Sequence, residues 1–499
     1  MALNTYRSFR FDTVEKFVEI YKTELYKVDL YYRKAYLSFQ ELHDSLFDLE
    51  TIAHAVANTL HSRYDRFLID LNVEWQKILA EHNFNFHELN IEKQFNFYEK
   101  NIRHFDRKMV VIISDALRYE LGCELFEDLL IDNKNNLSIE PYLASVPSYT
   151  NLGMTNLLPH HKITVEKGDT DAVFKINEKP TYHSNREVIL QMAEETATTI
   201  GYAEIKKMSK EAKRAFFREH KLTYIFHDWI DAIGDKKRTE HASFEATQKA
   251  LDEIKWLVRN LTGELGISYL TITADHGFLY NHTELSENSR EVLPKPNGYT
   301  IESSRFVISE NAENKANGYT FPLRNTTSID SDWSVTIPRA INRYRKQGNI
   351  GVQFVHGGAS MQEVLVPVIK FYKHKKEIAQ SVTFRRVDNN NKILSGTLKI
   401  TLLQDIPVSN EHKSLEVVAA LYSDIGNQLL SNEVVVVLNS TSNNPKDRLF
   451  DAILSLNSEG SKASFCYLKF YDKNDKTRLN PLLNSDLITI SALMEKDDF

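Results

Sequence analysis

The chain has 499 residues, of which 42% are hydrophobic and 26% are charged, a composition typical of globular proteins. Its net charge of −7 argues against a protein that coats nucleic acid through bulk positive charge. The apolar runs are too short to span a membrane, and two cysteines are too few for a disulfide framework or a cysteine-based zinc site. The N-terminus also lacks the apolar core of a signal peptide, so we expect a cytoplasmic protein with no membrane partner. The length of the chain predicts two or three domains.

The first region, residues 1–105, is predicted to be helical. Apolar residues recur at helical spacing from Val14 to Val28, and neither glycine nor proline occurs before Gly122. Such helices most simply pack against the domain that follows, so we predict no chemistry in this region.

Residues 106–374 alternate apolar runs with helical patterns, which is typical of a βαβ sheet. The run from Met109 to Ile113 is apolar and β-branched, so we predict a strand that is buried on both faces. It leads to Asp115, and the carboxyl ends of parallel strands are where such sheets bind ligands. Three later segments are predicted to repeat this arrangement with Asp or His at the strand end: 223–231, 269–277 and 351–358.

Other parts of the chain show different patterns. Residues 160–220 are polar and are predicted to be an irregular insertion, and residues 281–345, rich in Asn, Ser and Glu, a long loop or lid. Beyond residue 374, short alternating segments separated by Asn, Asp, Ser and Gly predict an antiparallel β-sandwich. We expect residues 375–499 to form an accessory or partner-binding domain, because no group of metal-ligand residue types occurs there.

Metal-ligand residue types gather at the predicted strand ends. A site for phosphoryl transfer needs hard oxygen ligands, imidazoles and a nucleophile beside the metal. Thr150 follows the turn set by Pro147 and falls at or near a helix N-terminus, where negative charge is favoured. Two sets of residues meet the requirement: Asp115, Thr150, Asp275 and His276 in the first, and Asp231, Asp235 and His356 in the second.

No single residue in these sets is specific evidence. An Asp at a strand end is more often a helix cap, Asp-His-Gly is a common tripeptide, and a Thr before a helix is usually only an N-cap. Their order along the chain and their shared position at strand ends favour a site over separate structural roles.

The segments that carry these residues resemble a known family. Five of them occur in the order seen in the PglZ branch of the alkaline phosphatase superfamily: 114–120, 147–150, 231–235, 274–277 and 356–367. The resemblance covers residues 107–372 and implies an alkaline-phosphatase-like core sheet with flanking helices, in a protein of BREX phage defence that works with other BREX proteins. Members of that family usually carry a further large N-terminal region, so we expect a C-terminal portion or a short homologue.

The resemblance implies a role for each residue of the first set. Thr150 would be the nucleophile and would be bound to the first metal. That metal would be held by Asp115, Asp275 and His276. The mechanism would have two steps: attack of the Thr150 hydroxyl on phosphorus, then hydrolysis of the phosphothreonine by water. Phosphomonoesters, phosphodiesters and nucleic acid all remain open as substrates, since enzymes that act on each use such a constellation.

In the second set, Asp231 and His356 would hold the other metal. The superfamily commonly has a histidine where this chain has Asp235, which makes the site more anionic and leaves Mn²⁺ or Mg²⁺ open beside Zn²⁺. Loss of the second metal is the other interpretation, so we expect one or two divalent ions per chain. Arg118 would either bind a substrate oxygen or form a surface ion pair with Glu120 or Glu124.

Two functions of different classes fit these observations. The first is a metal-dependent phosphoester hydrolase of BREX defence, whether phosphodiesterase, phosphatase or nuclease. The second is a catalytically weak scaffold that docks other defence proteins through its helices and sandwich, and Asp235 is its best support. Metal content distinguishes the two functions, because a pure scaffold has no need to retain the metal.

Overall fold

The computed structural model describes residues 9–43, 50–131, 135–283, 287–311, 318–345, 353–373, 380–409, 412–424, 427–475, 478, 481–483 and 486–491. The chain divides into two compact units, Met1–His374 and Lys375–Phe499, and each has its own hydrophobic core. Within the described residues no helix is both long and apolar enough to cross a membrane. Residues 351 and 352, part of the segment predicted to end near His356, lie outside the described ranges.

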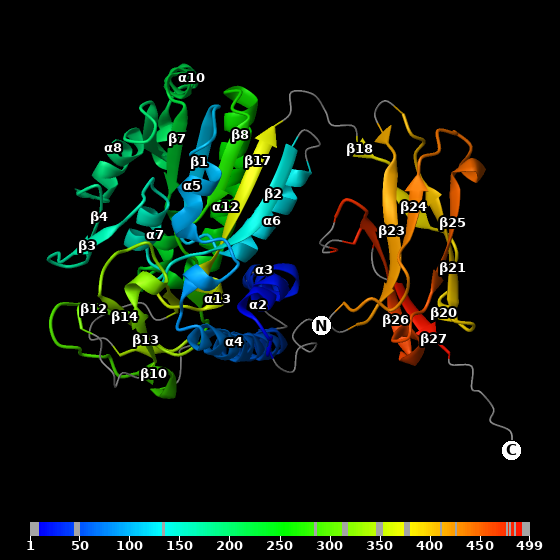
Figure 1. The fold of residues 1–499 in the computed structure, drawn as a ribbon, viewed down its shortest axis with the longest axis horizontal. Coiled ribbons are helices and arrows are strands. Elements are labelled where there is room, and N and C mark those ends of the chain that lie inside the picture. The colour runs from blue at the N-terminus through cyan, green and yellow to red at the C-terminus, as the bar shows by residue number, and fades with distance from the viewer. Residues whose placement is uncertain are drawn as a thin grey trace. The chain divides into compact units, whose positions relative to one another are not determined.

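The first unit is built on a six-stranded sheet (Figure 1). In spatial order its strands are β2 (Asn135–Leu143), β17 (Leu365–Lys373), β8 (Tyr269–Thr273), β1 (Met109–Ser114), β7 (Leu222–His227) and β6 (Ala197–Gly201). The strands β8, β1, β7 and β6 run parallel, whereas β17 runs antiparallel to both of its neighbours. The parallel part is the predicted βαβ sheet.

Helices and loops cover the sheet, so all six residues of β1 are buried, as its apolar sequence predicts. The helix α6 packs against β2 and β17, and α9 packs against β6 and β7. The helices that follow β1 are α6 (Tyr119–Leu130), α7 (Thr150–Asn156), α8 (Arg186–Gln191), α9 (Tyr202–Lys207), α10 (Lys210–Glu219), α11 (Trp229–Gly234), α12 (Ser243–Arg259) and α13 (Met361–Val364).

Two predictions of irregular structure are wrong. Residues 160–220 contain β6, the helices α8 to α10 and a small antiparallel sheet of β3 (Thr164–Glu166), β4 (Val173–Ile176) and β5 (Lys179–Pro180). The described part of residues 281–345 contains an antiparallel sheet in the order β11 (Thr300–Glu302), β12 (Val307–Ser309), β14 (Ser334–Ile337) and β13 (Tyr319–Pro322), and the pair β10 (Arg290–Glu291) and β15 (Arg343–Tyr344). Such short strands are defined by tertiary pairing and carry little local signal.

The strand before His356 differs from the prediction, because it lies outside the main sheet. It is the two-residue strand β16 (Phe354–Val355), which pairs antiparallel with β9 (Leu279–Tyr280). The segment that leaves β8 passes through Asp275 and His276 before it reaches β9. The β16–β9 pairing therefore brings His356 close to these two residues.

The N-terminal helices are part of the first unit. They are α2 (Val14–Ile20), a π-helical turn (Tyr21–Leu25), α3 (Tyr26–His43), α4 (Glu50–Glu81) and α5 (Phe97–Asn101). Their buried residues belong to the same hydrophobic core as the strands of the main sheet. Phe17 and Trp75, for example, pack edge to face with 5.3 Å between ring centroids. These helices therefore form one body with the sheet.

The second unit is a β-sandwich. One sheet has the order β19 (Phe384–Arg386), β21 (Thr397–Gln404) and β25 (Leu449–Ser455). The other has the order β20 (Lys392–Ile393), β27 (Asp486–Ile490), β26 (Phe465–Asp472), β23 (Leu415–Tyr422) and β24 (Val434–Leu438). Residues from both sheets form one core, while alternate residues of β25 are exposed. This agrees with the alternating pattern of the sequence.

Candidate metal centre

Two neighbouring strands of the main sheet lead into metal-ligand residues. The strand β1 leads into Asp115, and β8 leads into Asp275 and His276. All three side chains are buried. Ala116 takes a left-handed backbone conformation with a φ of 62°, and its amide N–H donates to Asp275 Oδ1 at 3.2 Å. This conformation costs free energy for a residue with a side chain, and such strain is typical of functional sites.

Thr150 is brought to these residues by α7, of which it is the first residue. Its Oγ1 lies 3.1 Å from His276 Nε2. Gly153 permits this approach, because a Cβ there would lie 2.4 Å from the carbonyl oxygen of Asp275. His276 Nε2 also lies 3.5 Å from Asp115 Oδ1 and 3.4 Å from Asp275 Oδ2. The four residues of the first predicted set therefore lie together.

The second predicted set also lies together. Asp231 is in α11 and Asp235 follows the end of that helix, so the four-residue spacing places both carboxylates on one side of a helical turn. His356 Nε2 lies 3.6 Å from Asp231 Oδ1 and 3.3 Å from Asp235 Oδ1. Asp235 is the more exposed of the two, at 53% against 17% for the Asp231 side chain. The chain bends directly after His356 at Gly357, whose φ of 112° favours glycine.

The two sets form one continuous cluster. The imidazole rings of His276 and His356 stack with 4.2 Å between centroids and 11° between planes. Asp115, Asp275 and His276 each place one ligand atom within 4.8 Å of the others. The same is true of Asp231, His276 and His356. His276 belongs to both groups, which the sequence did not indicate.

Three carboxylate oxygens of the cluster fit a bound cation. Asp115 Oδ1, Asp231 Oδ1 and Asp275 Oδ2 are buried and accept no hydrogen bond from the described residues. A buried carboxylate oxygen without a donor is costly, and a divalent cation bound among such oxygens removes the penalty. Carboxylate and imidazole donors together suit Zn²⁺ and Mn²⁺, and Mg²⁺ where oxygen predominates. The residues present therefore fit a divalent metal.

The second nitrogen of each imidazole faces a backbone carbonyl group. His276 Nδ1 lies 2.9 Å from the carbonyl oxygen of Gly277, and His356 Nδ1 lies 3.4 Å from that of Ser148. When Nδ1 carries the proton and donates to the carbonyl, the lone pair of Nε2 points at the carboxylates. Metal-ligating histidines are commonly held in one tautomer by such a contact.

Burial changes the titration of the cluster. It raises the pKa of Asp275 to about 6, and together with the charges of neighbouring carboxylates it holds the pKa of Asp115 well above its usual value. Burial also lowers the pKa of His276 to about 4, aided by the charge of His356. The pKa of His356 is raised to about 9, because Asp235 and the other carboxylates outweigh burial. Shifted groups crowded in one place are typical of functional sites.

Residues 97–371, more than half of the chain, match the model of a family described as the BREX system PglZ alkaline phosphatase-like domain. The chain belongs to the PglZ family. The membership and the alkaline phosphatase-like α/β fold expected from the sequence are thus confirmed, and the candidate metal-binding residues lie within the matched residues.

Two curated PglZ relatives match the chain over most of its length. It is 31% identical over 438 residues to the alkaline phosphatase-like protein PglZ of Bacillus cereus (strain H3081.97), covering 86% of this chain and 50% of that protein. It is 30% identical over 357 residues to the alkaline phosphatase-like protein BrxZ of Escherichia coli O9:H4 (strain HS), covering 70% and 41%. The chain spans about half the length, or less, of these relatives.

Solved structures also align with the chain. Murine ectonucleotide pyrophosphatase/phosphodiesterase 5 aligns with a TM-score of 0.37 and 13% identity, over 53% of this chain and 88% of that one. Phosphonoacetate hydrolase from Sinorhizobium meliloti 1021 aligns with a TM-score of 0.33 and 9% identity, over 53% of this chain and 89% of that one.

In this PglZ chain, Arg118 is not at the surface, where one of the two predictions placed its ion pair. Its side chain is buried, with Nη2 2.8 Å from Asp29 Oδ1 and the guanidinium 5.1 Å from the ring centroid of Phe278. Glu120, one of the acidic neighbours expected at the surface, is buried too and lies 4.0 Å from Arg118 Nε. The N-terminal helices cover this region, so Arg118 forms a buried ion pair with α3.

A different arginine, Arg186 in α8, lies close enough to the cluster for its carboxylates to act on it. Its side chain is only 8% exposed, and its guanidinium lies 5.0 Å from the ring centroid of Phe226 at the end of β7. Burial lowers the pKa of Arg186, against the charges of Asp275 and Asp115, which raise it. Sequence reasoning missed Arg186 because it lies in the segment predicted to be an insertion and follows no predicted strand.

Buried polar side chains from the N-terminal region hold the backbone around the cluster. Gln94 Nε2 donates to the carbonyl oxygens of Ala274 at 2.9 Å and Asp275 at 2.6 Å. Trp75 in α4 donates from Nε1 to the carbonyl oxygen of Ala359 at 3.0 Å. The exit of β8 and the segment after His356 are thus fixed by residues that precede β1.

The hydrogen bonds from α3 and α4 continue into α13. Asn72 Oδ1 accepts from the amide of Met361 at 2.8 Å, and Asn72 Nδ2 donates to Gln362 Oε1 at 3.0 Å. Gln362 Nε2 in turn donates to both carboxylate oxygens of Asp29 at 3.2 and 3.3 Å. These residues give no local signal in the sequence, because their partners are hundreds of residues away.

Proposed function

We propose that this PglZ domain is a metal-dependent phosphoester hydrolase with Thr150 as its nucleophile. The observation that carries the proposal is the convergence of three buried carboxylate oxygens on the imidazoles beside the Thr150 hydroxyl; none of the three accepts a hydrogen bond from the part of the chain that the structure describes. A divalent cation bound there would supply Lewis acidity, which stabilises charge on phosphoryl oxygens and lowers the pKa of a nearby hydroxyl. Zn²⁺ and Mn²⁺ suit the donor set best, and Mg²⁺ remains compatible with it.

Thr150 and Arg186 would have different roles in the reaction. Thr150 Oγ1 would attack phosphorus and release the substrate alcohol, and water would then cleave the phosphothreonine. Thr150 begins α7 and its hydroxyl already lies 3.1 Å from His276 Nε2, so a phosphate bound at the cluster would have its phosphorus within reach. Arg186 would place a positive charge near the phosphate oxygens. The substrate class includes phosphomonoesters, phosphodiesters and nucleic acid, and the setting would be BREX phage defence with other BREX proteins.

The test is hydrolysis of bis-p-nitrophenyl phosphate and p-nitrophenyl phosphate by chelator-treated protein to which Zn²⁺, Mn²⁺ or Mg²⁺ is restored. We expect turnover only with metal, and a loss of at least about a thousandfold in Thr150→Ala. Thr150→Ser keeps a hydroxyl and should retain part of the activity. Metal-supported turnover that survives Thr150→Ala would reject this nucleophile. Folded protein with no turnover on either ester with any of the three metals would reject the hydrolase.

One observation favours a second function, a catalytically weak scaffold for other BREX proteins. With a pKa raised to about 9, His356 is positively charged at neutral pH and lies between Asp231 and Asp235. The second set is therefore partly neutralised without a second metal. Elemental analysis of protein purified without chelator separates the two functions: a hydrolase retains divalent ions that Asp275→Ala abolishes, and a scaffold contains none.

A further inference from the structure

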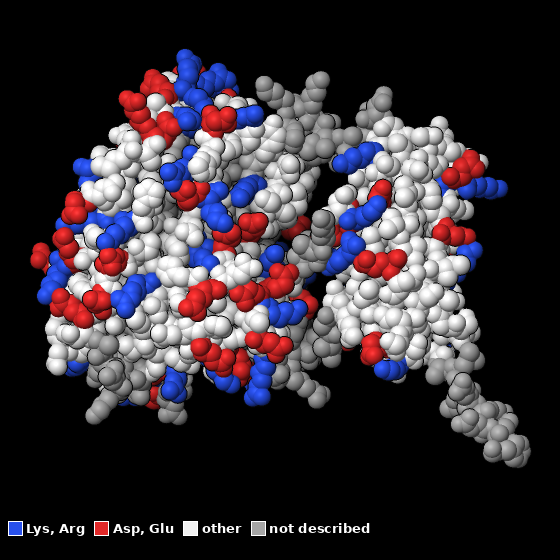
Figure 2. Space-filling view, viewed as in Figure 1, with Lys and Arg blue, Asp and Glu red and all other residues white. Residues whose placement is uncertain are grey.

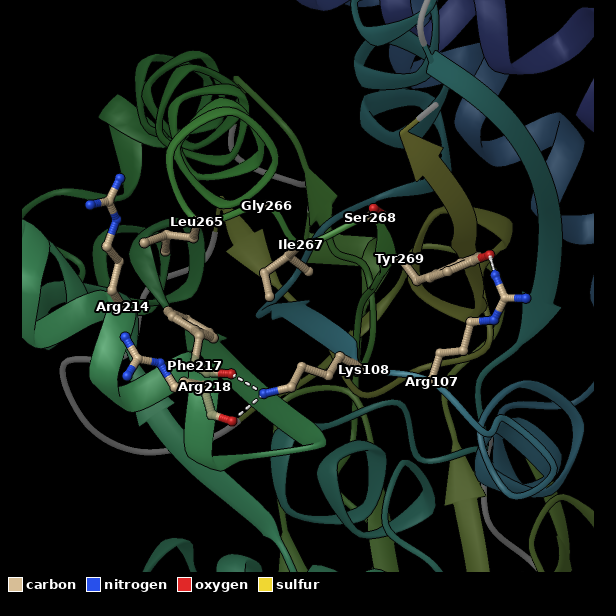
Figure 3. A pocket seen from close by; sticks show the side chains of 10 residues that line it. All are labelled: Arg107, Lys108, Arg214, Phe217, Arg218, Leu265, Gly266, Ile267, Ser268 and Tyr269. Carbon is tan, nitrogen blue, oxygen red and sulfur yellow. Dashed lines mark hydrogen bonds between the residues drawn. The ribbon is translucent and has the colours of Figure 1, made fainter. Parts of the chain in front are cut away.

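A second concave site lies at the other end of the main sheet from the metal centre (Figure 3). It is a cavity of about 490 Å³ formed by residues 107–108 before β1, by α10 and by residues 265–269, where β8 begins. The strands β1 and β8 have six and five residues, so at ~3.3 Å per residue the two sites are separated by roughly 20 Å. Open α/β sheets bind their ligands at the carboxyl ends, so the fold does not account for this cavity.

The lining of the cavity is basic around an apolar surface. Its four cations are Arg107, Lys108, Arg214 and Arg218. None of the lining residues is an Asp or Glu, although the whole chain has a net charge of −7. Phe217 and Ile267 are largely buried in the wall of the cavity and, with the partly exposed Leu265, supply the apolar surface between the cations. Figure 2 shows Lys and Arg gathered at the end of the unit where α10 lies, with Asp and Glu beside them.

Two of the cations are held by neutral groups. Lys108 Nζ donates to the carbonyl oxygens of Phe217, at 2.7 Å, and of Arg218 near the end of α10. Arg107 Nη1 donates to the Tyr269 hydroxyl at 2.5 Å, and both residues lie on the side of the cavity away from Arg214 and Arg218 (Figure 3). Asp106 lies 3.9 Å from Arg107 Nε, but its side chain is 91% exposed to water. These contacts position the two cations and leave most of their charge uncompensated.

The other two cations are one helical turn apart on α10. Arg214 and Arg218 are exposed, and neither guanidinium has a carboxylate within 4.0 Å among the described residues. Like charges at this spacing repel each other on a helix. The charge of Arg218 also acts on Lys108, whose pKa is lowered by burial and by that charge. A bound anion would relieve the repulsion at all three positions.

We propose that this cavity binds an organic phosphate, with the phosphate on Lys108, Arg214 and Arg218 and the body of the molecule against Phe217 and Ile267. Guanidinium groups bind phosphate oxygens through paired hydrogen bonds, which explains two arginines on one helix face. The apolar surface suits the base or sugar of a nucleotide. A nucleotide unit therefore matches both parts of the lining. The proposal rests on this cavity alone and is independent of hydrolysis at the metal centre.

A second, neighbouring hollow makes it possible to distinguish two sources of the nucleotide, a free nucleotide and a nucleotide within a single strand. It has a volume of about 350 Å³, shares Tyr269 with the first cavity and is lined by Lys100, Phe105, Lys370 and Tyr372 among others. Cations and aromatic rings in sequence along a groove are the usual path of a single strand. A free nucleotide needs the first cavity only. A strand would extend into the second hollow.

The test measures binding by isothermal titration calorimetry to the whole chain carrying Asp275→Ala, in EDTA, so that the metal centre does not contribute. The ligands are inorganic phosphate, AMP and a twelve-nucleotide oligothymidylate. We expect AMP to bind more tightly than inorganic phosphate, because only AMP covers the apolar surface. Adding Arg214→Ala and Arg218→Ala should weaken AMP binding roughly tenfold or more. Lysine at both positions should restore part of it.

The matched control is Lys207→Ala with Lys210→Ala, which removes two cations from the neighbouring surface outside the cavity and should leave binding unchanged. Equal AMP affinity with and without the two arginines would overturn the proposal, and so would failure of all three ligands to bind at millimolar concentration. Tighter binding of the oligonucleotide, reduced by Lys370→Ala, supports a strand as the source. Equal affinity for AMP and oligonucleotide supports a free nucleotide.

Discussion

Arg186, Asp115 and Asp275 are buried, and the two carboxylates raise the pKa of Arg186 against the effect of burial. Under the proposed function, Arg186 would add a positive charge near a phosphate bound at the cluster, beside the charge of a cation held by the carboxylates. Arg186 has no such role in a protein that only docks partners. Its replacement therefore tests the chemistry without removing any proposed metal ligand.

Arg186→Ala is expected to lower kcat/KM for p-nitrophenyl ester hydrolysis roughly 10- to 100-fold, because a hydrogen bond from a charged donor is worth about 1.5–3 kcal/mol. Arg186→Lys keeps the charge but loses the planar guanidinium group, so its kcat/KM should lie between those of the unsubstituted protein and Arg186→Ala. Steady-state kinetics with metal in excess measure the effect. Unchanged kcat/KM in Arg186→Ala, at unchanged metal content, would show that the arginine does not contact substrate.

Metal binding should release protons from the second half of the cluster. The pKa of His356 in the metal-free protein is raised to about 9, so at pH 7.5 its ring is protonated, whereas a ligand must be neutral. We expect about one proton to be released per ion bound there, and the affinity to rise as pH increases toward 9. Calorimetric titration with Zn²⁺ in buffers of different ionisation enthalpy measures the release. Heats that do not depend on the buffer would contradict the involvement of His356.

Residue positions were predictable where the signal is local. Asp115 and Asp275 each follow an apolar run, so their place at a strand end can be inferred from a few neighbouring residues. The partner of Arg118 is not local, because Asp29 reaches it only when α3 packs on the sheet. The stacking of His276 on His356 likewise depends on the β16–β9 pairing, which spans more than seventy residues of sequence.

At the scale of elements, α3 and α4 hold the backbone next to the candidate metal centre in place. Asp29 in α3 accepts from Tyr21 and Tyr64, pairs with Arg118 and accepts from Gln362 in α13. A single buried carboxylate thus connects the helical region, the start of α6 and the segment after His356.

Asp29→Asn is expected to destabilise the first unit by about 3 kcal/mol or more, because it leaves the buried guanidinium of Arg118 without its closest counter-charge. The control Asp70→Asn breaks an exposed ion pair with Arg66, 3.4 Å long, and should cost less than about 1 kcal/mol. Urea unfolding followed by circular dichroism compares them. Equal effects of the two substitutions would contradict the buried network.

Elements with a strong local sequence pattern were predicted, and elements without one were not. The central strands β1, β7 and β8 are five or six residues rich in apolar, aromatic and β-branched side chains, and the sandwich strands alternate over several residues, so both carry a pattern. The strands β11 to β14 are three or four residues long in polar sequence, and only their partners define them. The edge strand β6 was not predicted for a similar reason, because it lies within residues 160–220, the predicted irregular insertion.

At the scale of the whole molecule, two hydrophobic cores predict two unfolding transitions. Residues of the metal cluster belong only to the first unit, so a bound metal should stabilise that unit alone. Removing a metal present at 100 times its Kd should cost the first transition about 2.7 kcal/mol and leave the second unchanged. Differential scanning calorimetry with and without EDTA tests this, with Asp275→Ala as a control that should not respond. A chelator effect on both transitions would contradict the assignment.

The hydrogen bond between Asp29 and Gln362 joins residues 333 positions apart, and that between Trp75 and Ala359 joins residues 284 apart. During translation, Asp115 and Thr150 leave the ribosome long before His356 and the segment that α3 and α4 hold in place. A nascent chain would therefore carry the nucleophile without a complete metal centre. Under the proposed function, activity would begin only when synthesis of the first unit is nearly complete. Unfinished chains would then not hydrolyse phosphoesters in the cell that makes them.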